Sequence, residues 1–339
     1  MLHLTHTCLI TGGAGFIGSH LAQRLVEHDR RVILIDDLST GRLDNVAALV
    51  DADRAVYVRG RVSDVLREQP GIMRGVTQVY HLAASVGVKL VVDNPGRMVC
   101  NNIIETAAVL DAAERAGAAT LIASSSEVYG QCPVLPLRED MTLVYGPTTA
   151  SRWSYGMAKA LDEHLALHGP GNRPRRCLAV RLFNTIGPRQ LGHYGMVVPR
   201  MLARALAGQP VEIYGDGSQT RTFCDVRDVT DAMVRLMDDP AHLGRVYNLG
   251  SDRQRTINDL ADVVQRITGS TAGRRYVPYE AVYGPGFEDP PQRCPDLTRI
   301  RTAIGFVPTY ELEHTLAAIL AQWQGGAPAL QTAESLPSS

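Results

Sequence analysis

Short apolar runs alternate with stretches of helical spacing along the first half of the chain. The runs have the length of β-strands, and the segments between them carry apolar residues every three or four positions. This alternation predicts an α/β fold, with a parallel sheet and helices on both faces. The predicted strands are Thr7–Ile10, Arg31–Ile35, Ala55–Val58, Gln78–Leu82, Thr120–Ala123 and Cys177–Leu182, and the predicted helices are Phe16–His28, Ser63–Glu68, Met98–Ala116 and Ser154–His168.

The second half is less regular and richer in Gly and Pro, and clear helical spacing is confined to Val197–Ala207 and Ile257–Thr268. We interpret it as a smaller domain that closes over the carboxyl edge of the sheet. Residues 324–339 are rich in Gly, Ala, Pro and Ser, which predicts a mobile tail. The predicted first domain spans 1–182 plus about 226–252, and the second spans 183–225 and 253–323.

Composition excludes several classes of partner. The chain has 34 Lys and Arg against 35 Asp and Glu, so it offers no electrostatic footprint for nucleic acid or an anionic membrane. No apolar run reaches the ~18 residues of a spanning helix, and the N-terminus lacks the basic flank of a signal peptide. The six cysteines are scattered without a CxxC pair, which favours a reduced cytoplasmic protein without disulfides or a metal site.

A glycine-rich turn follows the first predicted strand and opens the first helix. It reads Thr-Gly-Gly-Ala-Gly-Phe-Ile-Gly over 11–18. Gly12 or Gly13 serves the turn, Gly15 lies where backbone approaches a pyrophosphate, and Gly18 lies where the helix packs on the strand. Free N–H groups at the start of the helix would then hold the pyrophosphate.

Acidic residues after the second and third strands bear on which dinucleotide binds. Asp36 and Asp37 follow the last glycine at close to the ~20 residues at which a carboxylate accepts hydrogen bonds from a ribose. A carboxylate there repels a 2′-phosphate and favours NAD over NADP, although Arg42 argues the other way. Asp64 has about equal claims to an adenine contact and to the first turn of a helix.

A tyrosine and a lysine lie one helical turn apart in Tyr155-Gly-Met-Ala-Lys159. The Lys159 ammonium favours the phenolate, so we expect a lowered pKa for Tyr155, which suits a general base. Upstream, the fifth strand ends in Ser-Ser-Ser-Glu-Val-Tyr-Gly over 124–130, at the edge of the sheet where ligands bind. A hydroxyl there could hold the substrate oxygen that Tyr155 deprotonates.

Taken together, six motifs resemble those of extended short-chain dehydrogenases/reductases that act on nucleotide sugars. The resemblance covers roughly residues 5–320 and implies a Rossmann-like, doubly wound sheet of about seven strands with a smaller substrate-binding domain. It also implies a tightly held NAD, a UDP-sugar substrate and often a homodimer formed through a four-helix bundle. The motifs are TGGAGFIG, His81–Ala84, Ser124–Gly130, YxxxK, Arg181–Arg189 and Ile213–Val229.

The resemblance assigns roles to individual residues. Ser125 matches the hydroxyl on the C4 oxygen of the sugar, Tyr155 the base and Lys159 its partner. The other expected cofactor contacts are Phe16, Ile17, Ser39, Thr40, Gly41, Val65, Leu82, Ala83 and Ala84. The other expected substrate contacts are Val86, Lys89, Arg152, Val197, Asn184 at the diphosphate or sugar, Tyr214 beside the nucleotide base and Arg221 at the diphosphate.

The pair Ser126-Glu127 separates the reactions of this family, which all begin with oxidation at C4 to a 4-keto sugar. An epimerase returns the hydride to the other face, a 4,6-dehydratase expels water, and a decarboxylase loses the C5 carboxylate because the 4-keto sugar is a β-keto acid. UDP-glucuronate decarboxylases have Ser-Glu at this pair. Hexose dehydratases have Asp-Glu, apiose synthases Cys-Glu and simple 4-epimerases small neutral residues.

Two further stretches resemble decarboxylases. Ser151–Tyr155 is similar to the RW-x-Y segment of the bacterial decarboxylase of the aminoarabinose pathway and of apiose/xylose synthases, and Tyr283–Asp289 and Gln292–Asp296 are similar to their YGxGYxD and R-x-PD segments. Arg293 falls on the arginine that lies near the substrate carboxylate.

Arg293 could bind that carboxylate, while Glu127 and Ser126 assist its departure or the later protonation of C5. A Glu127 that faces a substrate carboxylate would have a raised pKa. A salt bridge at the end of the strand is the alternative for Glu127, and a diphosphate contact is the alternative for Arg293.

The loop Ala84–Leu90 departs from typical decarboxylases, because it lacks their small and Pro-rich residues and carries Lys89. Lys89 could hold a carboxylate or only cover the surface. The Ser-Glu pair and the two further stretches favour decarboxylation of UDP-glucuronate to UDP-xylose or its 4-keto pentose. Because of the loop, a UDP-hexuronate or UDP-hexose 4-epimerase is the alternative. A non-catalytic NAD-sensing protein is disfavoured because both Tyr155 and Lys159 are present.

Overall fold

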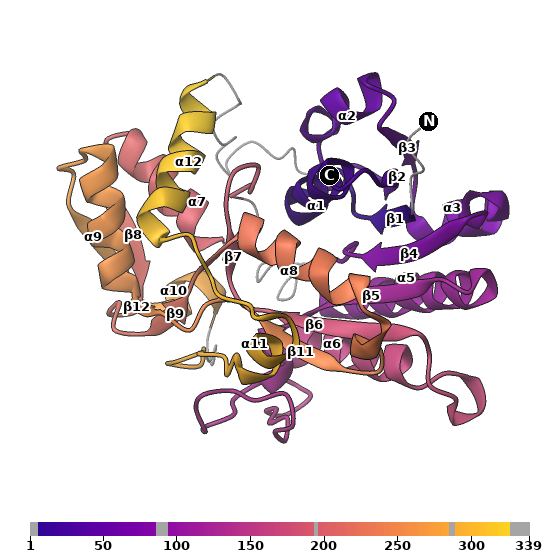
Figure 1. Cartoon of the computed structure of the whole chain (residues 1–339). Coiled ribbons are helices and arrows are strands. Elements are labelled where there is room, and N and C mark those ends of the chain that lie inside the picture. Colours follow the sequence, from indigo (N-terminus) through magenta and orange to yellow (C-terminus); the bar gives the residue numbers. More distant parts are fainter. Residues whose placement is uncertain (1–5, 86–93, 193–195, 285–288, 326–339) are drawn as a thin grey trace.

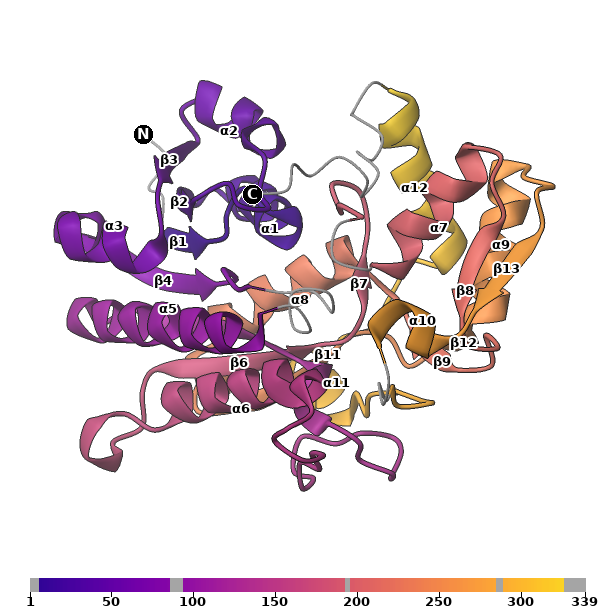
Figure 2. The same cartoon turned by 180° about the vertical axis from the view of Figure 1, so that it is seen from behind.

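The computed structural model describes residues 6–85, 94–192, 196–284 and 289–325. A large layered part and a smaller part lie side by side (Figure 1), and the view from behind shows the same two parts (Figure 2). Val86, Lys89 and the predicted tail beyond 325 lie outside the described residues.

A seven-stranded sheet forms the larger part of the described chain, and every neighbouring pair in it is parallel. The order β11-β6-β5-β4-β1-β2-β3 reverses direction beside β1, and a doubly wound sheet binds its ligands at the carboxyl ends of the strands at that point. The strands are β1 (Thr7–Thr11), β2 (Arg31–Asp36), β3 (Ala55–Arg59), β4 (Val76–His81), β5 (Ala119–Ser125), β6 (Cys177–Leu182) and β11 (Val246–Leu249). The predicted fold class is confirmed.

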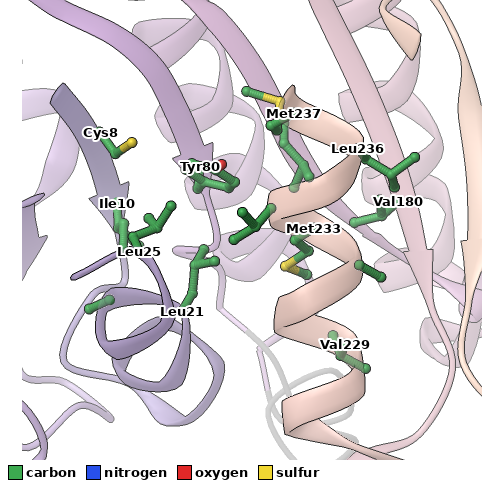
Figure 3. Close-up of a cluster of buried hydrophobic side chains, with 14 of the residues drawn as sticks. Cys8, Ile10, Leu21, Leu25, Tyr80, Val180, Val229, Met233, Leu236 and Met237 are labelled. Atoms are coloured by element: carbon green, nitrogen blue, oxygen red, sulfur yellow. The ribbon is translucent and has the colours of Figure 1, made fainter. Parts of the chain in front are cut away.

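Helices bury both faces of this sheet. Because successive side chains of a strand point to opposite faces, Cys8 and Ile10 of β1 pack on one side and Leu9 on the other. Figure 3 shows the first side, where Leu21 and Met233 lie among the apolar side chains between the helices and the strands. The first side holds α1 (Phe16–Glu27), α2 (Ala47–Asp51), α8 (Val226–Asp238) and α11 (Thr298–Ile304), and the second holds α3 (Val62–Glu68), α5 (Pro95–Ala116) and α6 (Ser154–Leu167).

The smaller part has its own apolar core, in which the buried faces of three helices meet β8. One of these helices begins with a capping box, in which Thr256 and Asp259 exchange side-chain and backbone hydrogen bonds, and ends at Gly269 in the left-handed conformation. The elements are α7 (Val197–Leu206), β8 (Val211–Tyr214), α9 (Ile257–Thr268), β13 (Arg274–Val277), α10 (Tyr279–Tyr283) and α12 (Leu312–Gln324).

Outside the large sheet, the described strands form short two-stranded pairings. The pairs β7–β10 and β8–β13 are parallel and β9–β12 is antiparallel, with β7 (Thr185–Ile186), β9 (Thr220–Thr222), β10 (Cys224–Asp225) and β12 (Gln254–Thr256). The remaining ordered turns are the 3₁₀ helices Leu43–Asn45, Pro70–Met73, Ser126–Tyr129, Ser151–Trp153, Pro170–Asn172 and Pro240–His242.

The predicted elements are all present, with their ends shifted by at most a few residues. The sequence pattern missed the helices α2, α8, α10, α11 and α12, the strand β11 and the short strands outside the large sheet. Helix α8 is buried around most of its circumference and carries Asp228 and Thr230 inside, so polar residues interrupt its apolar stripe. The exact division into two domains stays a prediction. Within the described ranges, no helix is long and apolar enough to cross a membrane.

Candidate functional site

Steric constraints shape the glycine-rich turn between β1 and α1. Gly12 has a φ of 69°, and a Cβ there would lie 2.9 Å from the backbone nitrogen of Ala83. A Cβ on Gly18 would overlap the carbonyl oxygen of Gly12, and one on Gly15 would lie 3.1 Å from the same oxygen. A side chain at any of these positions would push α1 away from β1 or strain the turn.

The start of α1 is suited to bind an anion. Gly15 is its N-cap, no side chain of the described residues caps it, and Phe16 and Ile17 begin the helix. The first N–H groups of a helix need an external acceptor, and the helix dipole favours a negative one. The turn and the helix start therefore fit the pyrophosphate of a dinucleotide.

Asp36 lies beside this turn and is 7% exposed. Its carboxylate accepts hydrogen bonds from the backbone nitrogens of Ala14 (3.0 Å) and Leu38 (2.8 Å), and burial raises its pKa. The backbone of Gly15 also donates to it, so of the about four lone pairs of a carboxylate one remains for a ribose hydroxyl. Asp37 is exposed and accepts from the backbone of Ser39 at 2.9 Å.

The remaining expected residues near β2 crowd Asp36 or lie on the surface. Thr40 is exposed, and a Cβ on Gly41 would lie 2.7 Å from the Asp36 carboxylate. Arg42, the argument for NADP, lies 3.7 Å from Asp44 in an exposed ion pair.

The two predicted cofactor contacts on α3 have partners within the larger part. Asp64 pairs with Arg67 at 2.6 Å, and Val65 is 4% exposed in the apolar core. The carboxylate that binds the start of α3 comes instead from Glu105 of α5, which accepts from the backbone and hydroxyl of Ser63. The adenine contact for Asp64 and the cofactor contact for Val65 stay predictions.

The carboxyl ends of β1 and β4 are joined by hydrogen bonds. The backbone nitrogen of Leu82 donates to the Thr11 carbonyl, and that of Ala83 donates to the Thr11 hydroxyl, each at 3.2 Å. His81 lies between the hydroxyls of Thr11 (2.7 Å) and Thr106 (3.1 Å). Burial and the Lys159 charge lower the pKa of His81 to about 3, so its ring is neutral. Ala84 follows in the segment toward the site.

Tyr155 and Lys159 lie one turn apart on α6, which approaches the end of β5 closely. A Cβ on Gly156 would overlap the carbonyl oxygen of Glu127, so glycine permits this approach. Tyr155 makes a hydrogen bond with Ser125, whose hydroxyl also accepts from the backbone of Glu127 at 3.2 Å. The structure thus brings the predicted hydroxyl and base together.

Three consecutive serines, Ser124 to Ser126, lie at the end of β5 and the start of the next turn. Ser125 is the one beside Tyr155. Ser124 points the other way and donates to Glu163 at 2.5 Å, and Glu163 forms a bidentate pair with Arg181. Ser126 is 4% exposed and begins the following 3₁₀ turn.

The expected lowering of the Tyr155 pKa is wrong for this structure. Burial is the first cause and raises the pKa of Tyr155 well above its usual value, the carboxylates of Glu127 and Asp162 raise it further, and the hydrogen bond with Ser125 opposes them. The Lys159 ammonium, which was expected to favour the phenolate, lies 3.1 Å from Asp162 in a buried pair.

A buried cluster of charges lies next to Tyr155. Glu127 is held between two guanidinium groups, at 2.6 and 3.3 Å from Arg152 and at 2.5 and 3.4 Å from Arg293. Asp289 lies 3.3 Å from Arg152 and also pairs with Arg221. Among the described residues of this cluster, three cations face two anions, and this excess of one positive charge favours an anionic ligand.

This cluster also determines the pKa of Glu127. Arg293 and Arg152 hold the pKa of Glu127 well below its usual range, despite burial. Glu127 is therefore a carboxylate in this structure, where it forms the salt bridge at the end of the strand. The raised pKa expected beside a substrate carboxylate stays a prediction.

The other predicted substrate residues lie on the smaller part or at its edge. The amide of Asn184 donates to the carbonyl of Thr222 at 2.9 Å. One face of the Tyr214 ring is covered by the Arg200 guanidinium at 3.7 Å, and its edge meets Tyr283 at 5.8 Å. Val197 begins α7 and packs against the second core.

Sequence reasoning missed Asp289, Asp162 and Arg200. Asp289 ends a segment that resembles decarboxylases, and Asp162 lies seven residues after Tyr155, which is two turns along the same helix face. The resemblance and the spacing are signals that could have found these two residues. The position of Arg200 over Tyr214 depends on how α7 packs and has no signal in the sequence.

Together, the fold and the site define a dinucleotide-dependent α/β enzyme in which Tyr155 and Ser125 lie beside a buried cluster of charges. The chain belongs to the NAD dependent epimerase/dehydratase family, whose sequence model matches residues 8–250. NAD, the expected cofactor, agrees with this family, and the turn and Asp36 fit it.

Similar proteins share nearly the whole chain. The UDP-N-acetyl-alpha-D-glucosaminuronate decarboxylase of Bacillus cytotoxicus is 36% identical over 93% of this chain and 97% of its own length. UDP-glucuronic acid decarboxylase 1 of Arabidopsis thaliana is 33% identical over 93% of this chain and 69% of its own length. The solved structure of UDP-glucuronic acid 4-epimerase from Bacillus cereus, in complex with UDP-glucuronic acid and NAD, has a TM-score of 0.80 and 28% identity, over 94% of this chain and 99% of that one.

Replacing Gly18 by alanine should weaken NAD binding without unfolding the chain. The overlap with the Gly12 carbonyl must be relieved by a shift of α1, at a cost of about 1–3 kcal/mol. This corresponds to ~5- to 150-fold weaker binding, measured by calorimetric titration of the cofactor-free protein with NAD. Gly71→Ala is the control, because no atom lies within 4 Å of its added Cβ. Unchanged affinity in folded Gly18→Ala would contradict the assignment.

Proposed function

We propose that the protein is an NAD-dependent decarboxylase of a UDP-hexuronic acid, which converts UDP-glucuronate to UDP-xylose or its 4-keto pentose. The observation that carries this proposal is the buried Glu127–Arg152–Arg293 cluster beside Tyr155. A site for a neutral hexose has no need of this surplus cation, whereas a uronate carboxylate complements it. The names of the relatives at 36% and 33% identity support the same reaction.

Tyr155 and Ser125 supply the first step. Their hydrogen-bonded pair holds the C4 hydroxyl of the sugar, and Tyr155 removes its proton. NAD, when bound, supplies the acceptor for the hydride of C4. The Lys159 ammonium, on the same face of α6, stabilises the phenolate that this requires.

The second step breaks the bond between C5 and the carboxylate carbon. The 4-keto group accepts the electron pair as an enolate, CO₂ leaves, and a proton is then added at C5. Ser125 and Tyr155 donate hydrogen bonds to the C4 oxygen, where the negative charge develops. Arg293 orients the carboxylate before it leaves, and Glu127 lies where a proton donor is needed.

Substrate binding can change the protonation of Glu127. A uronate that pairs with Arg293 removes part of the stabilisation of the Glu127 carboxylate and adds a like charge beside it. Both effects raise the pKa of Glu127 toward the range of an acid catalyst. The low pKa that Arg152 and Arg293 give Glu127 is therefore compatible with proton donation by Glu127 once the uronate is bound.

A UDP-hexuronate 4-epimerase is the second candidate. The similarity to a solved epimerase in complex with UDP-glucuronic acid favours it, because such an enzyme also binds a uronate. The two reactions share the C4 oxidation and separate only in the fate of the carboxylate.

The mass of the product separates these functions. We expect UDP-glucuronate, incubated with the protein and NAD, to give a product lighter by one CO₂, with UDP-N-acetylglucosaminuronate tested in parallel. UDP-glucose is the control without a carboxylate, and Tyr155→Phe should lower turnover by ~100-fold or more. An unchanged mass with a new retention time would establish the epimerase, and no reaction of any uronate would contradict both.

Glu127→Gln should spare NAD binding and impair decarboxylation by at least ~100-fold. The amide cannot deliver a proton and leaves two buried guanidinium groups without their anion. Steady-state turnover checks this, with Glu68→Gln, an exposed acid on α3, as control. Circular dichroism and NAD titration establish that the variant is folded, and unchanged turnover would remove Glu127 from the mechanism.

We also propose a homodimer in the cytoplasm. Helices α5 and α6 pack together and leave Ile104 (53% exposed) and Leu161 (50% exposed) on the surface, where a second copy could cover them. A reduced compartment fits the six cysteines, which are all free.

Sedimentation velocity tests the dimer. The wild type should sediment as a dimer and Ile104→Asp as a monomer, because a charge at the centre of an apolar interface loses its hydration. Val307→Asp, at an exposed apolar position (61%) remote from these helices in sequence, should remain dimeric. A monomeric wild type at micromolar concentration would contradict the proposal.

A further inference from the structure

Three polar side chains follow one another along one face of α6. Tyr155, Lys159 and Asp162 stand at positions i, i+4 and i+7, so each lies about one turn beyond the last. Lys159 and Asp162 are almost fully buried, with side chains 4% and 1% exposed, and the ammonium lies 3.1 Å from Oδ2 of Asp162. The other oxygen, Oδ1, is buried and has no hydrogen-bond partner among the described residues.

The neighbouring acid on the same helix shows how many hydrogen bonds a buried structural carboxylate accepts in this region. Glu163 accepts two hydrogen bonds from Arg181 and one from Ser124, so both of its oxygens are satisfied. Asp162, in contrast, pairs with the lysine of the site. A buried charge without full compensation costs stability, and such costs cluster at functional sites.

We propose that Asp162 is a positioning residue, which fixes the Lys159 ammonium on the active face of α6 and competes with the Tyr155 oxygen for its charge. Asp162 thereby sets the pH at which Tyr155 becomes a base. Since decarboxylation and epimerisation both begin with proton removal at the C4 hydroxyl, the proposal goes beyond the fate of the carboxylate.

The other charges that face Tyr155 and Lys159 are each accounted for. Glu127, in the turn after β5, is offset by two arginines, Arg152 before α6 and Arg293 from the loop after α10. His81, at the end of β4, is neutral. Glu127 raises the pKa of Tyr155 more than Asp162 does, but Asp162 is the carboxylate that pairs with the lysine of the site. Because its charge raises the pKa of Tyr155, its removal should lower that pKa.

Spectroscopic titration of Tyr155 in the NAD-bound enzyme, without substrate, tests this. The ultraviolet absorbance of tyrosinate is followed against pH, and the signal of Tyr155→Phe is subtracted. Asp162→Asn should move the midpoint down by ~1 pH unit or more, and Asp162→Glu should restore it toward the wild type. Asp111→Asn, an exposed acid on α5, should leave it unchanged.

Turnover gives a second readout. The acidic limb of kcat/KM should move to lower pH in Asp162→Asn by the same amount as the titration, while KM for the sugar stays near the wild-type value. A wild-type midpoint in folded Asp162→Asn would overturn the proposal. If the Asp162→Asn variant does not fold, Asp162→Ala replaces it in the test. Its midpoint should shift in the same direction. The titration needs no substrate, so failure of the proposed reaction would not affect it.

Discussion

The close approach of α6 to the end of β5 is the constraint on which the candidate site depends. Gly156 lets the helix backbone lie against the Glu127 carbonyl, and this contact sets Tyr155 beside Ser125. The same approach places Arg152, which directly precedes α6, against the Glu127 carboxylate. One contact between a helix and a strand end therefore assembles both the base and the anion-binding cluster.

The charges in this region are distributed in two groups that serve different steps. Lys159 and Asp162 form one buried pair along α6, and Arg152 and Arg293 enclose Glu127 in the other group. Buried pairs contribute little net stability, because desolvation offsets their attraction. Their cost is better explained by the proposed chemistry, in which the first group would control a proton at C4 and the second would bind and release a carboxylate.

The sequence predicted those parts of the site that depend on local spacing. The glycine turn, Asp36 and the Tyr155–Lys159 pair lie within single strand-turn-helix units, so their geometry follows from periodicity and turn chemistry. The contacts Glu127–Arg293 and Arg152–Asp289 join residues 166 and 137 positions apart, and the register of these contacts depends on the tertiary fold. The pKa expectation for Tyr155 failed because it considered Lys159 alone and omitted burial and the carboxylates of Glu127 and Asp162.

Asp289 links two arginines of the cluster that come from different parts of the chain. Its carboxylate bridges Arg152, beside the reacting end, and Arg221 on β9, which the family resemblance assigns to the diphosphate. Through Asp289, the arginine expected at the diphosphate is linked to the cluster beside Tyr155 by side-chain contacts alone. The nucleotide end and the sugar end of the expected substrate would therefore meet one continuous set of paired charges.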